Sequence, residues 1–119
     1  MTLDEPQFTL GIEEEYLLVD KETRSLVVDP PKSLLSDCKE LLGNQVTNEL
    51  LRSQIEIGTK VCNNIQEARQ DLVKLRKHVI EVTGRYGIAP IACSTHPFSR
   101  WSEQELTPKD RYDLLTTEM

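Results

Sequence analysis

The chain has 119 residues, of which 38% are hydrophobic and 29% are charged, and its formal net charge is −6 at pH 7. This length allows one domain at most, with a modest core, and the composition is that of a globular chain rather than a disordered one. The negative charge argues against nucleic acid and anionic membranes as binding partners. It leaves open a nucleotide, because bound metal ions can reverse the local electrostatic field.

The terminus and the cysteines indicate the compartment. Residues 1–7 are acidic and lack an apolar core, unlike a signal peptide, and no apolar run approaches the ~20 residues of a membrane helix. Cys38, Cys62 and Cys93 are odd in number and widely spaced, which suits a reducing compartment better than a disulfide framework. The sequence therefore predicts a soluble, cytoplasmic protein that does not bind membranes.

The first half of the chain predicts strands around one helix. Residues 8–20 are expected to form a strand, and residues 25–28 a second strand that pairs with it as a hairpin. Asp29-Pro30-Pro31 ends this hairpin and begins a helix that reaches about Leu42, where Gly43-Asn44 ends it. Residues 45–58 are expected to be extended.

The clearest helix is predicted over residues 65–86, where apolar side chains recur every three or four residues. Asn64 and Glu67 have the spacing of an N-cap and its reciprocal partner, and Gly87 is a natural C-terminal stop. The apolar stripe of this helix consists of Ile65, Ala68, Leu72, Leu75, Val79, Val82 and Tyr86.

The remaining elements complete a mixed pattern. Residues 88–93 predict a strand in which Pro90 favours an edge or bulge position. A loop with His96-Pro97 follows, and Thr107-Pro108 begins a last helix that runs to residue 119. The order β-β-α-β-β-α-β-α predicts an α+β fold. Because the chain stops inside an amphipathic helix, residues 1–119 are expected to be part of a larger domain.

Three adjacent carboxylates, Glu13, Glu14 and Glu15, lie inside the first predicted strand. Side chains alternate between the faces of a strand, so Glu13 and Glu15 share one face, about 6.6 Å apart, and Glu14 takes the other. Two like charges at this separation repel each other and are costly to bury. A Mg²⁺ ion or another cation would remove that cost. The alternative is an edge strand whose charges are solvated.

A second acidic position is Glu56 in S-Q-I-E-I-G, where alternation turns the flanking isoleucines toward the core. Glu49 lies seven residues earlier on the preceding extended stretch. A lone glutamate on the outer face of a strand is ordinarily solvated. If these strands are neighbours in one sheet, however, Glu13, Glu15, Glu49 and Glu56 would converge on one face and would need cations.

Two further residues are candidates for a site. Pro97 holds His96 in an extended conformation at a loop mouth, beside hydroxyl and arginine side chains; the alternative is a loop histidine without a role. Arg111, at the start of the last helix, could hold a carboxylate or a phosphate and is the candidate contact for a cofactor. The alternative for Arg111 is a surface ion pair with Asp110 or Glu105.

Four segments, T-L-G-I-E-E-E-Y, S-Q-I-E-I-G-T-K-V-C, S-T-H-P-F-S-R-W and D-R-Y, resemble in order and spacing the type 2 glutamate–cysteine ligase family, also described as carboxylate–amine ligases of the YbdK type. The resemblance covers essentially the whole chain, and its specificity lies in the order of the four motifs. It implies a fold similar to that of glutamine synthetase, with a curved antiparallel sheet, helices on one face, and carboxylates on the inner face of a funnel.

The resemblance also implies a reaction. In this family ATP phosphorylates the γ-carboxyl group of glutamate, and an amine then displaces phosphate, so ATP, Mg²⁺ and amino-acid substrates are implied. Carried over by motif, Glu13, Glu15 and Glu56 would be metal ligands. Glu49 matches a further acidic position, and His96 would face the substrate or phosphate region.

The resemblance is confined to the N-terminal third or so of family members, which run to several hundred residues. A later H-V-H-x-G segment and the downstream basic residues that would hold ATP phosphates are absent, so the isolated chain is expected to be incomplete and inactive. Two alternatives stay open: a non-catalytic module that oligomerises or binds a partner, and another metal-dependent phosphoryl-transfer or hydrolytic enzyme. Unpaired sheet edges predict a homo-oligomer.

Overall fold

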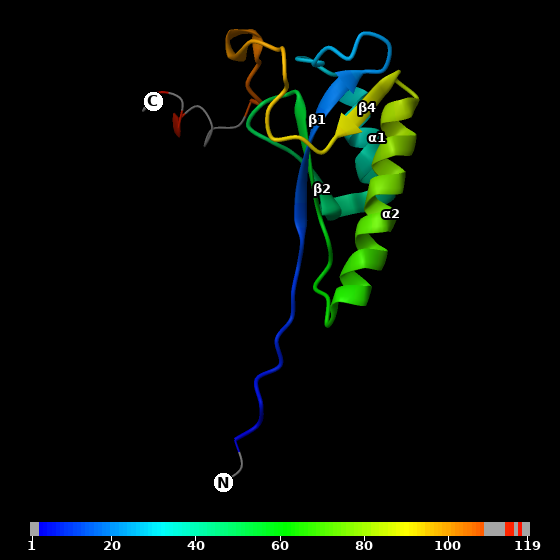
Figure 1. The fold of residues 1–119 in the computed structure, drawn as a ribbon, viewed down its shortest axis with the longest axis vertical. Helices are drawn as coiled ribbons and strands as arrows, with labels where there is room; N and C mark the ends of the chain where they lie inside the picture. The colour runs from blue at the N-terminus through cyan, green and yellow to red at the C-terminus, as the bar shows by residue number, and fades with distance from the viewer. Residues whose placement is uncertain (1–2, 109–113, 116, 118–119) are drawn as a thin grey trace.

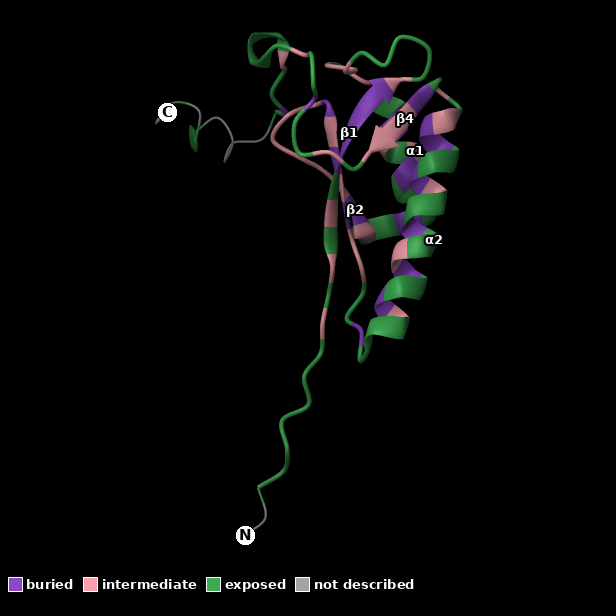
Figure 2. Cartoon of the chain, in the orientation of Figure 1, coloured by how far each residue is buried: buried purple, intermediate pink, exposed green. Residues whose placement is uncertain are grey.

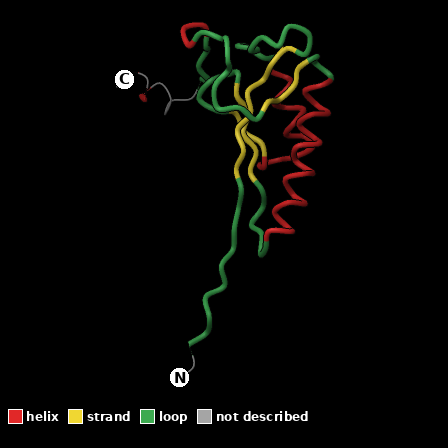
Figure 3. Tube along the Cα trace, in the orientation of Figure 1, coloured by secondary structure: helices red, strands yellow, loops and turns green. Residues whose placement is uncertain are grey.

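The computed structural model describes residues 3–108, 114, 115 and 117. Within these residues, four strands form one antiparallel sheet in the order β2-β3-β1-β4, and two long helices pack on one of its faces (Figure 1, Figure 3). This arrangement confirms the predicted α+β fold with helices on one face. The elements in chain order are β1 (Glu13–Asp20), α1 (Lys32–Leu42), β2 (Val46–Asn48), β3 (Gln54–Gly58), α2 (Ile65–Gly84) and β4 (Ile88–Ile91).

Strand β1 lies at the centre of the sheet but is not flanked along its whole length. Its residues 13–17 pair with β3, whereas residues 17–20 pair with β4 on the opposite side. The N-terminal half of β1 therefore has a strand neighbour on one side only within the described part of the chain. That half carries Glu13, Glu14 and Glu15.

The predictions for residues 8–20 and 25–28 are wrong in part, and the first strand begins at Glu13. Residues 25–28 do pair with β1 in the antiparallel sense, but through a single bridge between Val19 and Leu26 rather than a ladder. Pro30 and Pro31 follow closely and have no N–H group to donate, so the pairing cannot continue. The extended stretch 45–58 contains β2 and β3, which pair with each other, and this agrees with the two strands that the predicted element order places there.

Helix α2 has the predicted cap, and its inner side is buried against the sheet (Figure 2). Asn64 Oδ1 accepts a hydrogen bond from the N–H group of Glu67 at 2.9 Å, and the Glu67 carboxylate accepts one from the N–H group of Asn63 at 2.8 Å. Leu75 is completely buried, but Ile65 is 64% exposed. Ile65 lies in the first turn of α2, and its place in the buried stripe was predicted wrongly.

The core lies between the helices and the sheet. Strands β1 and β3 contribute Tyr16, Leu18, Ile55 and Ile57 to it. Of the described cysteines, Cys38 and Cys62 are buried and all are free thiols, as the sequence predicts. Pro90 lies in β4, an edge strand of the described sheet, which confirms its predicted position. In the described part of the chain, no helix is both long and apolar enough to cross a membrane.

Replacing Leu75 with alanine tests the packing of α2 on the sheet. Because Leu75 is completely buried, Leu75→Ala is expected to lower the free energy of unfolding by about 2–5 kcal/mol in urea melts. Val73→Ala, at a 43% exposed position of the same helix, is the matched control and should change stability by less than about 1 kcal/mol. Equal effects of the two substitutions would contradict the assigned packing.

Candidate metal centre

The carboxylates of β1 are divided between the two faces of the sheet. Glu14 turns toward α2, where it pairs with Arg76. Glu15 lies directly opposite Glu56 in the antiparallel pairing of β1 and β3. Glu13 lies on the same face, because its Cγ atom is 3.8 Å from the position that a Cβ atom on Gly58 would occupy. The predicted sharing of one face by Glu13, Glu15 and Glu56 is therefore confirmed.

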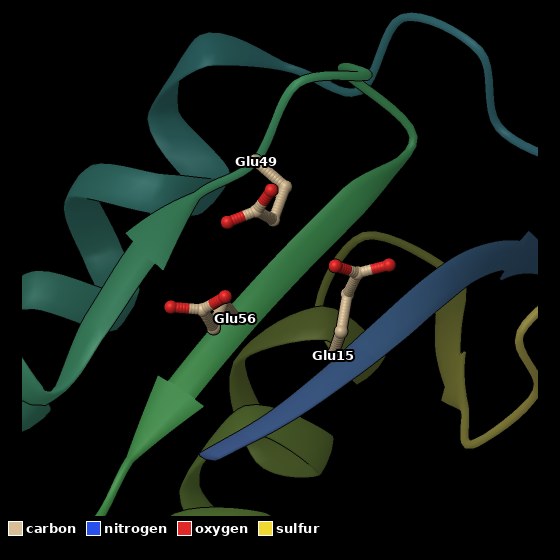
Figure 4. A group of neighbouring side chains, drawn as sticks. All are labelled: Glu15, Glu49 and Glu56. Atoms are coloured by element: carbon tan, nitrogen blue, oxygen red, sulfur yellow. The ribbon is translucent and has the colours of Figure 1, made fainter.

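Three carboxylates converge on this face, away from the helices (Figure 4). Glu15 comes from β1, Glu56 from β3, and Glu49 from the segment that follows β2. One carboxylate oxygen of each lies within 4.8 Å of an oxygen of the other two. A cation with oxygen ligands at about 2.0–2.6 Å requires ligand oxygens no more than about 4–5 Å apart. Small side-chain rotations would therefore let one cation contact all three residues.

The described part of the chain supplies no cation to this cluster, since its salt bridges all involve other carboxylates. The carboxylates of the cluster instead accept hydrogen bonds from neutral donors. Gln54 Nε2 donates to Glu15 Oε1 at 2.8 Å, and the N–H group of Leu50 donates to Glu49 Oε2 at 3.2 Å. Neutral donors orient carboxylates but do not cancel their charge, so the cluster favours a positive ligand.

Of the carboxylates in this cluster, Glu56 has the most strongly raised pKa. Its pKa is raised from 4.5 to about 7 by burial, by a hydrogen bond with Glu49 and by the negative charges of Glu49, Glu13 and Glu15. Burial and the charge of Glu49 also raise the pKa of Glu15. A proton held by Glu56 near neutral pH partly performs the charge compensation that a metal ion would perform fully.

Glu14 has the opposite environment on the helix side of β1. Hydrogen bonds from Arg76 lower the pKa of Glu14 against the effect of burial. Adjacent glutamates of β1 therefore differ in their ionic partners. Within the described chain, Glu14 has a cationic partner, whereas Glu13 and Glu15 have none.

His96 is buried, and both of its ring nitrogens contact backbone groups. Nδ1 lies 3.1 Å from the N–H group of Ser99 and 3.3 Å from that of Phe98, so it must accept hydrogen bonds. Nε2 therefore carries the proton and donates to the carbonyl oxygen of Arg24 at 2.9 Å. His96 joins its loop to the turn after β1. Its role toward a substrate stays a prediction and would require these bonds to open.

The other candidate and two unexpected residues complete the comparison with the sequence. Arg111 lies outside the described residues, and Glu105, one of its predicted alternative partners, pairs with Arg52 at 2.8 Å. Arg76 was not among the candidate residues of the sequence, and its contact with Glu14 was missed. Asp71 was also missed: it is buried and accepts hydrogen bonds from Gln45 Nε2 and the N–H group of Lys60, each at 2.9 Å. No periodicity in the sequence indicated these long-range partners.

The raised pKa of Glu56 predicts a pH-dependent stability. The folded state holds the Glu56 proton more tightly than the unfolded chain, because the pKa is about 7 in the first and near 4.5 in the second. The wild type should therefore lose stability relative to Glu56→Gln as the pH rises from about 4.5 to about 7, and the difference should level off above that range. Urea melts of both proteins in EDTA measure this difference, and a difference that is constant with pH would contradict it.

Comparison with known proteins identifies the family of this chain. Residues 9–119 match the model of glutamate-cysteine ligase family 2 (GCS2). A protein of Rhodospirillum rubrum named "Putative glutamate--cysteine ligase 2" is 50% identical over 119 residues, which cover 97% of this chain. Proteins with the same name from Jannaschia sp. and Chloroflexus aurantiacus are 50% and 40% identical over 118 residues, which cover 99% and 94% of this chain.

The matched regions are confined to part of each relative. They cover 31% of the Rhodospirillum and Jannaschia proteins and 28% of the Chloroflexus protein, so the chain spans roughly a third of the length of these relatives. The family match itself extends over nearly all of this chain and includes the segments that carry the carboxylate cluster. The chain belongs to glutamate–cysteine ligase family 2.

Proposed function

We propose that Glu15, Glu49 and Glu56 bind a divalent cation, with Glu13 beside them, and that this chain forms the metal-binding face of an ATP-dependent carboxylate–amine ligase. The observation that carries the proposal is the convergence of three carboxylates from three segments without a cationic partner in the described chain. Membership of glutamate–cysteine ligase family 2 supports the ligase assignment.

The donor set fits Mg²⁺ better than a softer metal. Among the described residues, the cluster consists of carboxylates and includes neither a histidine nor a cysteine. Zinc sites are usually built with histidine and cysteine ligands. Mg²⁺ prefers oxygen ligands such as carboxylates, keeps several waters and takes further ligands from substrate phosphate oxygens. The cluster is partly open to solvent, which leaves room for such ligands.

The residues of this chain have defined tasks in the proposed reaction. Gln54 orients the Glu15 carboxylate, and the N–H group of Leu50 orients that of Glu49, so both carboxylates are aimed at a common point before a ligand arrives. Bound Mg²⁺ would neutralise charge on the phosphate oxygens of ATP during transfer. Glu13 adds negative charge at the edge of the cluster.

The proposed substrates follow the names of the relatives, which mention glutamate and cysteine. The γ-carboxylate of a glutamate-like acid attacks the terminal phosphorus of ATP, which forms an acyl phosphate and releases ADP. The amine of a second amino acid then attacks the acyl carbon and displaces phosphate. His96 and Arg111 remain the proposed contacts for the substrate and for phosphate.

Metal binding by the chain tests this proposal. Mn²⁺ is a suitable probe because its unbound form gives a strong electron paramagnetic resonance signal, and Mg²⁺ should compete with it. We expect Glu15→Gln and Glu56→Gln each to weaken Mn²⁺ binding by at least about tenfold, since each removes one anionic ligand.

The matched control is Glu81→Gln, which removes an exposed carboxylate that pairs with Arg85 on α2. This variant should bind Mn²⁺ as the wild type does. Failure of the wild type to bind Mn²⁺, or equal binding by Glu15→Gln, would contradict the proposal.

The open sheet edges favour a second property, self-association. Strands β2 and β4 are the outer strands of the described sheet, and unpaired edges favour pairing with another chain. Pro90 removes a donor from β4, so β2 is the better edge for such pairing. We therefore expect a concentration-dependent dimer or higher oligomer in sedimentation equilibrium. A monomer at every concentration up to the millimolar range would contradict this expectation.

A further inference from the structure

The register of β1 is poorly specified by its own sequence. Register is normally set by alternation of buried and exposed side chains, since a slip of one residue turns every side chain to the other face. In β1, however, Glu13–Glu15 are all glutamates and Tyr16–Val19 are all buried. A slip of one residue would exchange glutamate for glutamate and, over much of the strand, one buried apolar residue for another.

One contact on the helix side distinguishes the two registers. Arg76 of α2 binds both oxygens of the Glu14 carboxylate, with Nε 2.7 Å from Oε1 and Nη2 2.5 Å from Oε2. The hydroxyl group of Tyr16 donates to the same carboxylate at 2.9 Å. The Glu14 side chain is only 18% exposed although that of Arg76 is 53% exposed, so this carboxylate is held under the helix.

In the observed register one carboxylate faces α2, and Arg76 binds it through Nε and Nη2. A slip of one residue would turn Glu13 and Glu15 toward α2 and would leave only Glu14 on the site face. Arg76 would then face two carboxylates with one positive charge, and the opposition of Glu15 to Glu56 would be lost.

This part of β1 needs an additional constraint because it pairs with β3 alone. Strand β4 joins β1 only from Leu17 onward. The Glu14–Arg76 contact, between a strand and a helix 62 residues apart in sequence, is the one salt bridge of β1 among the described residues.

We infer that Arg76 is a positioning residue: by binding Glu14 it fixes the register of β1 in which Glu15 opposes Glu56, and so assembles the carboxylate cluster from the opposite face of the sheet. The consequence for metal binding rests on the proposed function, whereas the consequence for register does not. Ion pairs with one exposed partner contribute little to global stability, so the loss of this contact should be visible in register and metal binding before it is visible in melting.

The test compares Arg76→Gln with Arg85→Gln, which breaks the exposed pair of Arg85 with Glu81 on the same helix. Cross-strand backbone nuclear Overhauser effects report the register, and Mn²⁺ titration reports the cluster. We expect Arg76→Gln to give a second set of β1–β3 contacts, in which Glu15 no longer opposes Glu56, and to weaken Mn²⁺ binding by at least about tenfold. Arg85→Gln should change neither.

The charge-swapped double variant Glu14→Arg/Arg76→Glu should restore the single register and bring Mn²⁺ affinity back to within about threefold of the wild type. The double variant also tests the inference if Arg76→Gln fails to fold. A double variant that does not restore the Glu15–Glu56 pairing would overturn the inference. If Arg76→Gln folds with the single wild-type register, the inference is overturned, whatever its Mn²⁺ affinity. The inference is also overturned if the wild type binds Mn²⁺ and Arg76→Gln binds it with unchanged affinity. If the wild type binds no Mn²⁺, the proposed function is wrong, and the register measurement alone tests the role of Arg76.

Discussion

The antiparallel pairing of β1 with β3 is the constraint on which the rest of the structure depends. It places Glu15 opposite Glu56 and Tyr16 opposite Ile55. Alternation then sends every second side chain of both strands to the helices and the others to the opposite face. One face is therefore sealed by α1 and α2, and the other carries the carboxylates. A single register thus builds the core and the candidate site together.

Charge is distributed unevenly across this sheet. Within the described chain Glu14 receives a guanidinium group from α2, while Glu15, Glu49 and Glu56 receive only neutral donors or one another. A cluster of like charges is costly in a folded protein unless something outside the chain balances it. A divalent cation would balance it, and ligases that activate a carboxylate with ATP need such a cation beside the phosphates. Local electrostatics therefore supports the proposed cation site on this face, and family membership supports the ligase assignment.

Much of the fold followed from local sequence rules. The cap of α2, the end of α1 at Gly43 and the core direction of Ile55 and Ile57 depend on neighbouring residues only, and each was predicted. The shared face of Glu13, Glu15 and Glu56 followed from strand alternation once the strands were neighbours. These features depend on period and propensity, which the sequence displays directly.

The features that sequence reasoning missed depend on distant partners. Arg76 has the spacing of a solvated helix residue, and only the placement of α2 under β1 makes it a partner of Glu14. The bonds of His96 to Arg24 and of Asp71 to Lys60 likewise cross between elements. Residues 25–28 have strand composition, but the following prolines limit them to one bridge. Periodicity contains no information about such contacts.

The most direct test of the account is anomalous diffraction from crystals of this chain soaked in Mn²⁺. The account predicts an anomalous peak between β1 and β3 on the face away from α2, at about 2.0–2.3 Å from carboxylate oxygens of Glu15, Glu49 and Glu56. It also predicts that the peak is absent from crystals of Glu15→Gln soaked in the same way. A wild-type crystal that diffracts well, contains Mn²⁺ elsewhere and shows no peak at these three carboxylates would contradict the central claim.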